Sequence, residues 1–256
     1  MNLQRMAAAE KVAVELGYLK LTDAAPLVIA NELGFFSDAG LKVTLTQEVS
    51  WANIRDKLAT GALDGAQMLA PLPAMTTLGV SGLRIPLITG LVLSRNGNAI
   101  TLSKRLLDDV DTQQFCETDR LISASLINHL KVQTGRRLTL AVVHGFSTHN
   151  LMLRRWLKQG DVDPDKDVSI IIVPPSQVVD SLESGVIDGF CAGSPWGTIA
   201  AARGTGFTLA AGIDIWRDAP EKVFCVSEAW HESHPSTHLR LRIALMRACD
   251  RSEEHT

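Results

Sequence analysis

Cysteine, histidine and serine carry most covalent and metal chemistry in proteins, but their spacing in this chain matches no such chemistry. Cys116, Cys191, Cys225 and Cys249 form no Cys-x-x-Cys pair and no metal-binding spacing, and we expect Cys191 to fill the core. Residues 145–149, Gly-Phe-Ser-Thr-His, lack the second glycine of a nucleophile elbow. The sequence also contains no phosphate loop of the form Gly-x4-Gly-Lys-Ser/Thr. We therefore expect no catalytic residues.

His231 and His234, on either side of Glu232, are the remaining candidates for metal chemistry. Their i, i+3 spacing falls on a polar stretch, where histidines are most often solvated side chains of the surface. No Gly-x-Gly-x-x-Gly segment follows a strand pattern, so a bound dinucleotide is not indicated either. The sequence therefore predicts neither a metal site nor a cofactor.

The chain contains an internal repeat. Residues 58–65, Leu-Ala-Thr-Gly-Ala-Leu-Asp-Gly, are matched 124 residues later by residues 182–189, Leu-Glu-Ser-Gly-Val-Ile-Asp-Gly. Pro71 and Pro195 keep the same offset. Each copy is typical of a helix that ends at a glycine and is followed by a short apolar strand.

The same offset relates two further pairs of predicted helices. One helix is expected over residues 23–36 and its counterpart over 147–159, and both begin with side-chain oxygens that can cap free N–H groups. We assign Asp23 to this capping role, since a carboxylate would repel an anion. The next helices start near Ser50-Trp51 and Pro174-Pro175. Apolar strands are expected before and after the first helices, over residues 12–19, 41–46, 138–143 and 168–173.

The repeating unit is therefore strand, helix, strand, helix, strand, and two such units predict two α/β lobes with mostly parallel sheets. In parallel sheets, ligands bind beyond the carboxyl ends of the strands, where helix N-termini point. A cleft between two such lobes would present free N–H donors and positive dipole ends, which favour an anion. We assign residues 1–97 plus 223–250 to lobe 1 and 98–222 to lobe 2, with surface helices over 103–135.

Composition narrows the class of partner. The 256 residues have a net charge of −3 and a hydrophobic fraction of 46%, which does not indicate direct binding of nucleic acid. No apolar run approaches the ~20 residues of a transmembrane helix. Glu10 and Lys11 interrupt the first apolar stretch too early for an export signal. We therefore expect a cytoplasmic protein, with a periplasmic one as the alternative if the recorded start is incomplete.

With these residues in hand, the chain resembles the substrate-binding proteins of nitrate, bicarbonate and cyanate transporters, the NrtA/CmpA family. Within that family it is most similar to the cytoplasmic nitrate sensors of the NasS type. The motifs that carry the resemblance occur in the family's order over nearly the whole chain. They are LTDAAPL (21–27), ELGFF (32–36), SWANIRD (50–56), LDGAQMLAP (63–71), NGNAI (96–100), TH (148–149), DPDKDV (163–168) and PEKV (220–223).

The resemblance implies a type II periplasmic-binding-protein fold with a ligand cleft between its lobes. It also implies that Trp51, His149 and Lys222 bind the ligand, and Lys222 favours nitrate because the similar bicarbonate binders carry an acidic residue there. Asn98 stands where the family has glutamine. The chain departs from the family pattern at two further positions that we expect to bind the ligand. Ser147 stands where relatives have glycine, and Ser194 stands where they commonly have glutamate.

The function that the resemblance implies is binding of a small oxyanion, nitrate or nitrite first, without enzymatic activity. The partner would be either an ABC permease and ATPase or an antiterminator-type regulatory protein. The alternatives are a binder of bicarbonate, cyanate or sulfonate for import, and an enzyme similar to the thiamine-precursor synthases of the same superfamily.

The end of the chain differs in character from the rest. Residues 251–256, Arg-Ser-Glu-Glu-His-Thr, equal the forward translation of a common sequencing adapter, and we expect the last helix to run only over residues 238–249. This predicts a non-native tail and a truncated C-terminus, since the relatives continue with helices that complete lobe 1.

Overall fold

The computed structural model describes residues 7–80, 82–118 and 121–253. The chain divides into two compact units, unit 1 of Met1–Arg95 and Pro220–Thr256 and unit 2 of Asn96–Ala219. The chain passes between the units at Asn96 and Gly97, both of which have positive φ angles, of 56° and 79°. The boundaries between the units fall after residues 95 and 219. The sequence placed the boundaries between the lobes a few residues later, after 97 and 222.

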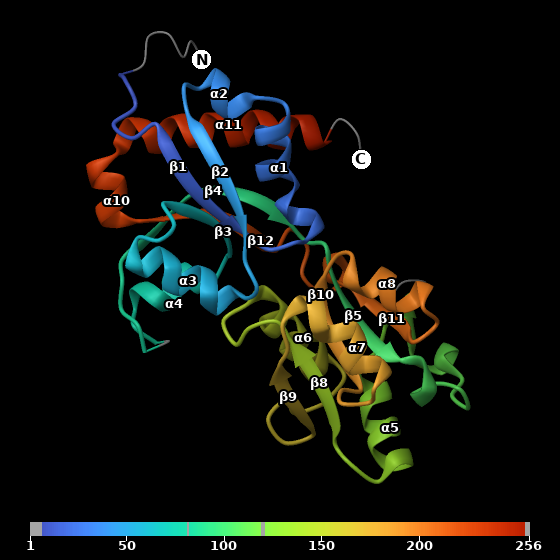
Figure 1. Ribbon diagram of the computed structural model, residues 1–256. Coiled ribbons are helices and arrows are strands. Elements are labelled where there is room, and N and C mark those ends of the chain that lie inside the picture. Colours follow the sequence, from blue (N-terminus) through green and yellow to red (C-terminus); the bar gives the residue numbers. More distant parts are fainter. Residues whose placement is uncertain (1–6, 81, 119–120, 254–256) are drawn as a thin grey trace. The chain divides into compact units, whose positions relative to one another are not determined.

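The sheet of unit 1 has five strands in the order β2-β1-β3-β12-β4. β1 pairs in parallel with β2 and β3, whereas β12 pairs antiparallel with both β3 and β4. The strand that returns from unit 2 thus lies between two strands of the N-terminal segment (Figure 1). The bounds are Ala13–Tyr18 (β1), Lys42–Gln47 (β2), Gly65–Leu69 (β3), Leu87–Arg95 (β4) and Pro220–Ser227 (β12).

The helices of unit 1 cover both faces of this sheet (Figure 1). α1, α2 and α11 pack against one another over an apolar core that includes Leu16, Leu27, Phe224 and Leu241. α3 packs on β3 and β12, and α4 packs on β3 and β4. The bounds are Thr22–Ala24 (η2, a 3-10 turn), Ala25–Glu32 (α1), Phe35–Asp38 (α2), Trp51–Thr60 (α3), Leu72–Thr77 (α4), Glu228–Ser233 (α10) and Pro235–Glu253 (α11).

Two helix predictions in unit 1 were wrong. The helix expected over residues 23–36 is a 3-10 turn and two helices, because Gly34 adopts a left-handed conformation with φ of 73° that ends the first helix. The last helix is longer than residues 238–249. It begins at Pro235, where proline is well tolerated because the first helical N–H has no partner, and it continues to Glu253. Residues 254–256 of the expected tail lie outside the described residues.

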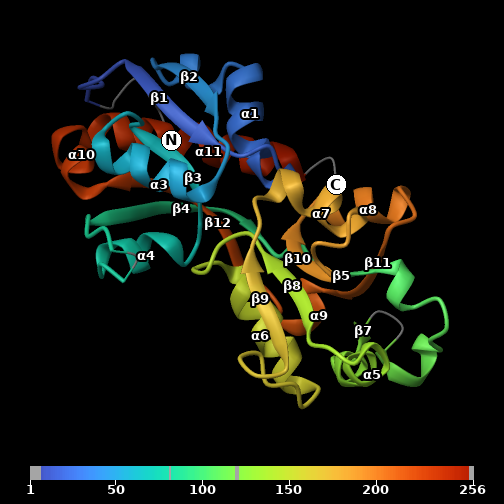
Figure 2. The same cartoon turned by 60° about the horizontal axis from the view of Figure 1, so that its bottom comes forward.

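The sheet of unit 2 has seven strands in the order β6-β7-β11-β5-β10-β8-β9. β8 pairs in parallel with β9 and β10, and β5 pairs antiparallel with β10 and β11 (Figure 2). The bounds are Asn98–Ser103 (β5), Cys116–Thr118 (β6), Leu121–Ile122 (β7), Leu138–Val142 (β8), Val168–Ile172 (β9), Gly189–Gly193 (β10) and Gly206–Ala211 (β11).

The core of unit 2 lies under α5 and α6, where Leu130, Leu153 and Trp156 are buried together with Cys191, the cysteine that we expected in the core. In the segment expected to form surface helices over 103–135, the described residues contain one α-helix, α5, preceded by two 3-10 turns and the short strands β6 and β7. The bounds are Lys104–Leu106 (η3), Thr112–Phe115 (η4), Ser125–Thr134 (α5), Thr148–Gln159 (α6), Pro175–Gln177 (η5), Val178–Glu183 (α7), Trp196–Ala202 (α8) and Gly212–Ile215 (α9). Among the described helices, none has the length and apolarity that crossing a bilayer requires.

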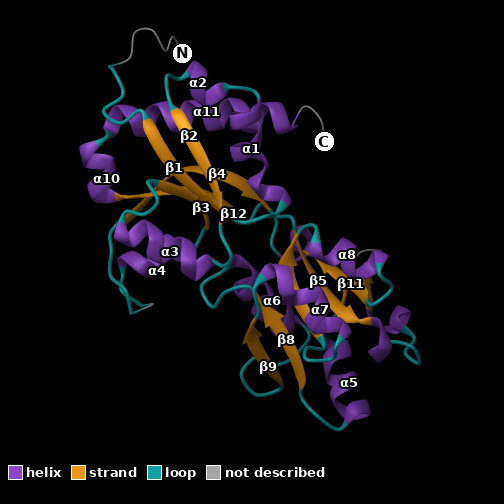
Figure 3. Ribbon diagram, in the orientation of Figure 1, coloured by secondary structure: helices purple, strands orange, loops and turns teal. Residues whose placement is uncertain are grey.

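The predicted repeat is confirmed, because strands and helices alternate from β1 to β3 and again from β8 to β10; Figure 3 colours the helices and strands of both units. β3 and β10 are offset by 124 residues at both ends. The two aspartates of the repeat also bond alike. The Asp64 carboxylate accepts from the N–H of Glu15 at 2.9 Å, and the Asp188 carboxylate accepts from the N–H of Thr139 at 2.8 Å. Asp64 therefore ties the start of β3 to β1, and Asp188 ties the start of β10 to β8.

Gly160, at the end of α6, is a position where a side chain should destabilise the protein. A Cβ there would lie 2.4 Å from the backbone nitrogen of Ser125 and 2.6 Å from the carbonyl carbon of Ala124. We expect Gly160→Ala to lower the free energy of unfolding by about 1–3 kcal/mol, because backbone must move to accommodate the methyl group. Urea unfolding measures this. Gly145→Ala is the control, since its Cβ would meet only Ile172 at 4.0 Å; equal stability of the two variants would contradict the prediction.

Candidate functional site

Polar side chains of unit 1 gather at the edge of the sheet where the parallel strands end. Asp23 lies in the 3-10 turn that follows β1, and Trp51 begins α3, the helix that follows β2. Lys222 of β12 pairs in register with Leu69, the last residue of β3. The carboxyl ends of parallel strands are where ligands bind in open α/β sheets, so these residues form the candidate site of unit 1.

Trp51 is held at this edge by the cap of its helix. The Ser50 hydroxyl accepts a hydrogen bond from the N–H of Asn53 at 3.2 Å, as in a typical N-cap. Trp51 itself is 1% exposed, and Lys222 Nζ lies 5.2 Å from the centroid of its ring, within the range of a cation–π contact. Its indole Nε1 is buried and has no hydrogen-bond acceptor among the described residues, which is uncommon for a buried donor.

Lys222 has two carboxylate partners. Its ammonium group donates to Asp23 Oδ2 at 2.6 Å and to Glu221 Oε1 at 2.5 Å, and its side chain is 0% exposed. Gln67 orients Asp23 by donating from Nε2 to Asp23 Oδ1 at 2.6 Å, and it accepts from the N–H of Leu19 at 3.1 Å. The assignment of Asp23 to helix capping was wrong. Its carboxylate belongs to this buried network, and η2 has no side-chain cap.

The network contains more negative than positive charge when all its groups are ionised. Burial raises the pKa of Asp23, although the nearby Lys222 ammonium opposes this change. Burial acts to lower the pKa of Lys222, but the Asp23 and Glu221 carboxylates outweigh it and hold that pKa above its ordinary value. Both pKa shifts favour binding of a proton, because two buried carboxylates have only one ammonium group to offset them.

The predicted site residues of unit 2 also share one edge of a sheet. Ser147 and His149 follow the end of β8, and Asn98 opens β5 opposite Gly193, the last residue of β10. Ser194 comes directly after that residue. Ser147, His149 and Asn98 are buried, whereas Ser194 is exposed. This edge corresponds, within unit 2, to the edge that carries Trp51 and Lys222 in unit 1.

The two serines of unit 2 make contacts with their own backbone. The Ser147 hydroxyl donates to the carbonyl oxygen of His144 at 2.7 Å and accepts from the N–H of Asn150 at 3.1 Å, so it caps α6. The Ser194 hydroxyl and N–H both donate to the carbonyl oxygen of Gly97, at 3.2 and 2.9 Å. Ser194 thereby fixes the start of β5 next to Asn98.

Each unit thus brings together its own share of the six predicted residues. Trp51 and Lys222 lie together in unit 1, and Lys222 belongs there rather than to the second lobe, because β12 pairs with β3 and β4. Sequence reasoning missed Gln67 and Glu221 as members of the site. Both stand among buried apolar residues of strands, and a polar side chain in such a strand was the available signal.

His231 and His234 also differ from the prediction that they are solvated side chains of the surface. His231 and His234 are half-buried rather than solvated, since His231 Nδ1 lies 2.9 Å from Nδ1 of the buried His238 and His234 stacks on Trp230. Burial, reinforced by His231 and Arg242, lowers the pKa of His238 to about 4. Over the described residues, no group of three histidine, cysteine or acidic side chains could hold a metal ion.

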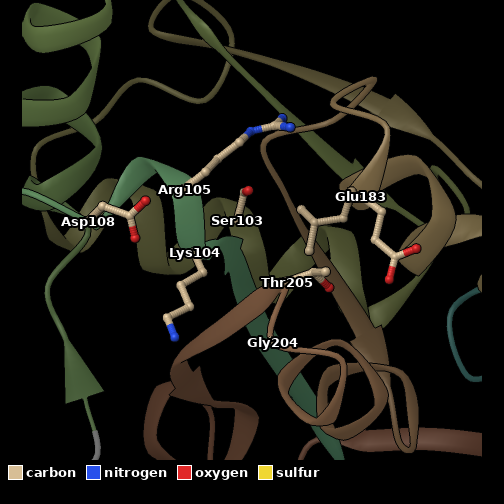
Figure 4. A pocket seen from close by; sticks show the side chains of 8 residues that line it. Ser103, Lys104, Arg105, Asp108, Glu183, Gly204 and Thr205 are labelled. Atoms are coloured by element: carbon tan, nitrogen blue, oxygen red, sulfur yellow. The ribbon is translucent and has the colours of Figure 1, made fainter.

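A cavity of about 400 Å³ opens on the surface of unit 2 (Figure 4). It lies at the opposite edge of the sheet from Asn98, since β5 ends there at Ser103. Its rim mixes Lys104 and Arg105 with Asp108 and Glu183. Because two cationic and two acidic side chains line this cavity, its charge does not favour an anion, and none of the predicted site residues lines it.

Two α/β units of this strand order, each with polar residues at the carboxyl edge of its sheet, define the fold of the periplasmic binding proteins. A solved structure confirms this class. The periplasmic nitrate-binding protein NrtA from Synechocystis PCC 6803 superposes with a TM-score of 0.85 at 31% identity, over 94% of this chain and 62% of that one. The chain belongs to the NMT1-like family, whose model matches residues 7–256.

Two curated relatives, both from Synechocystis sp. PCC 6803, are more similar in sequence. The nitrate import ATP-binding protein NrtC is 44% identical over 243 residues, and the bicarbonate transport ATP-binding protein CmpC is 45% identical over 245 residues. Each match covers 94% of this chain but 35% of the relative. The chain therefore spans about a third of the length of these relatives.

Proposed function

We propose that this chain is a binding module for a small oxyanion, with nitrate or nitrite as the favoured ligand, and that it is not an enzyme. The observation that carries the proposal is the buried pair of Lys222 and Trp51 at the carboxyl edge of unit 1. It combines a fully buried ammonium group with an indole N–H that has no acceptor among the described residues. The 31% identity to the nitrate-binding protein NrtA supports the same ligand class.

The chemistry of nitrate fits these groups. Nitrate is flat, singly charged and weakly basic, so it requires one compensating charge and modest donors in its plane. Lys222 provides the ammonium group that a buried anion needs nearby, and this group also pairs with Asp23 and Glu221. Trp51 provides an N–H donor and an apolar ring that excludes water. In unit 2, Asn98 and His149 have side chains of the types that can donate to an oxyanion.

Bicarbonate is the second candidate, and two observations favour it. The bicarbonate-transport relative CmpC and the nitrate-import relative NrtC are almost equally similar to this chain, at 45% and 44% identity. Bicarbonate also carries an O–H group, which can donate to a carboxylate such as Asp23. Against it stands Lys222, which favours nitrate according to the family resemblance described above.

We further propose that the module works with an ABC-type permease and ATPase, with an antiterminator-type regulator as the alternative partner. The names of NrtC and CmpC as ATP-binding proteins support the first. We propose a cytoplasmic location because Glu10 and Lys11 interrupt the first apolar stretch, and a periplasmic location is the alternative. Co-purification of the full-length protein from fractionated cells distinguishes these possibilities by compartment and by partner.

Titration calorimetry with nitrate, nitrite, bicarbonate and an alkanesulfonate tests the ligand assignment. We expect the tightest binding for nitrate. Trp51→Phe keeps the aromatic face but removes the N–H, and we expect about tenfold or more weaker nitrate binding, since a hydrogen bond to a charged group contributes ~1.5–3 kcal/mol.

Trp156→Phe is the matched control for this variant. It removes an indole N–H that donates to the Ile122 carbonyl in the core of unit 2, at 2.9 Å. It should lower stability and leave nitrate affinity within about twofold. No binding of any of the four anions to the folded wild-type chain would refute the proposed function.

A further inference from the structure

The buried network of unit 1 contains Asp23, Glu221 and Lys222, which we call the acid–lysine cluster. Its two carboxylates lie 2.6 and 2.5 Å from one ammonium nitrogen. The side chains of Lys222, Glu221 and Asp23 are 0%, 1% and 13% exposed. With all three groups ionised, the cluster carries one net negative charge before any ligand arrives.

A monoanion bound at Lys222 would bring the net charge of the cluster to minus two, in a site with little water. Buried charges that lack a counter-ion are costly, and titratable groups avoid the cost by binding or losing a proton. Lys222 is already a cation and cannot supply more charge. The remaining way to keep the net charge unchanged is for one carboxylate to take up a proton.

Asp23 is the carboxyl group in the better position to take up the proton. Its side chain retains some exposure, which gives a proton a route from solvent, whereas the Glu221 side chain is 1% exposed. Burial also raises the pKa of Asp23, despite the opposing effect of Lys222. Gln67 Nε2 binds Oδ1, so Oδ2, the oxygen now on Lys222, is the atom that would become an O–H.

The charged groups around Asp23 are few. Lys222 and Glu221, both from β12, act on its carboxyl group. α1 and β4 also pack against the turn that holds Asp23, and they carry Glu32 and Arg95. Within the described residues neither of these pairs with Asp23. The proton balance of the site is therefore set by the acid–lysine cluster itself.

We propose that anion binding at this site is coupled to the uptake of one proton, held on Asp23 Oδ2, so that an anion without a proton of its own binds together with one from solvent. This inference rests on the proposed function. It regulates the same site, because occupancy by nitrate then depends on pH as well as on nitrate concentration. It also separates ligand classes, since bicarbonate brings an O–H group that can donate to an ionised Asp23.

The test is calorimetry of the folded chain with nitrate between pH 5 and pH 9, in two buffers of different ionisation enthalpy. The difference in observed heat between buffers gives the number of protons taken up. We expect about one proton per nitrate at the alkaline end, with affinity falling about tenfold per pH unit there. At the acidic end, where Asp23 is already protonated, both the uptake and the slope should approach zero.

Asp23→Asn provides the second arm. The amide mimics the protonated carboxyl group, so this variant should bind nitrate with no proton uptake and with affinity that does not change with pH. Asp38→Asn, at an exposed carboxylate of the same unit that pairs with Arg247, should keep the proton uptake of the wild type. Nitrate binding without proton uptake over the whole range would overturn the inference and leave the proposed function intact. No nitrate binding at any pH would instead refute nitrate as the ligand, and the inference with it.

Discussion

Lys222→Met is expected to lower the free energy of unfolding by about 3–5 kcal/mol at pH 8, which is the usual cost of removing one partner from a buried ion pair. The variant leaves the Asp23 and Glu221 carboxylates facing each other in a buried site without a cation. These groups can escape the repulsion by binding a proton. The destabilisation should therefore be smaller at pH 5 than at pH 8, as measured by urea unfolding at both values.

A triple variant separates the loss of charge balance from the loss of side-chain packing. Asp23→Asn, Glu221→Gln and Lys222→Met together remove all three charges and keep similar volumes, and we expect stability within about 1.5 kcal/mol of the wild type. The single and the triple variants should both lose nitrate binding, because neither has the ammonium group. A single variant as stable as the wild type at pH 8 would show that Lys222 does not balance the two carboxylates.

Asp188→Ala should have the second largest effect, a loss of about 3 kcal/mol of unfolding free energy at pH 7. The Asp188 carboxylate is 2% exposed, accepts two hydrogen bonds from Arg136 at 2.6 and 2.7 Å, and accepts a third from the N–H of Thr139. Hydrogen bonds to charged groups contribute ~1.5–3 kcal/mol each when buried, and we discount those of Arg136 because it is half exposed.

The pH dependence of this effect has a definite sign. Burial opposes ionisation of Asp188, but its bonds to Arg136 and Thr139 prevail and lower its pKa below the ordinary 3.8. A group with a lowered native pKa stabilises the protein fully above the ordinary value, and this stabilisation is lost as the pH falls below it. The difference between wild type and Asp188→Ala should therefore be constant from pH 5 to 8 and shrink below about pH 3.8.

Asp180→Ala is the control for this measurement. Asp180 also pairs with an arginine, Arg203, at 3.0 Å, but its side chain is 75% exposed. Exposed ion pairs contribute little, so we expect a change of at most about 0.5 kcal/mol. If the two aspartate variants lost equal stability, the effect of Asp188 on the free energy of unfolding would not come from its burial and its bond to the N–H of Thr139.

The repeat could be predicted because its signals are local. A glycine at the end of a helix, a side-chain oxygen at its start and a run of apolar residues act within a few positions of the chain, and the same signals recur after 124 residues. The wrong helix predictions also follow from the local nature of these signals. Gly34 divides a predicted helix by adopting a positive φ. The apolar pattern around a glycine does not determine whether that glycine continues the helix or ends it.

The sequence by itself determined two α/β units and the edges at which their helices begin, and its resemblance to a known family implied six candidate ligand-binding residues. Only the tertiary structure decided that Asp23 and Glu221 share the Lys222 ammonium group, since the Lys222–Asp23 contact joins positions 199 residues apart. Helices and strands arise from short-range propensity and periodicity, which one chain displays directly. The partner of a buried charge depends on which strands lie side by side, and β12 reaches its place between β3 and β4 only after the whole of unit 2 has been traversed.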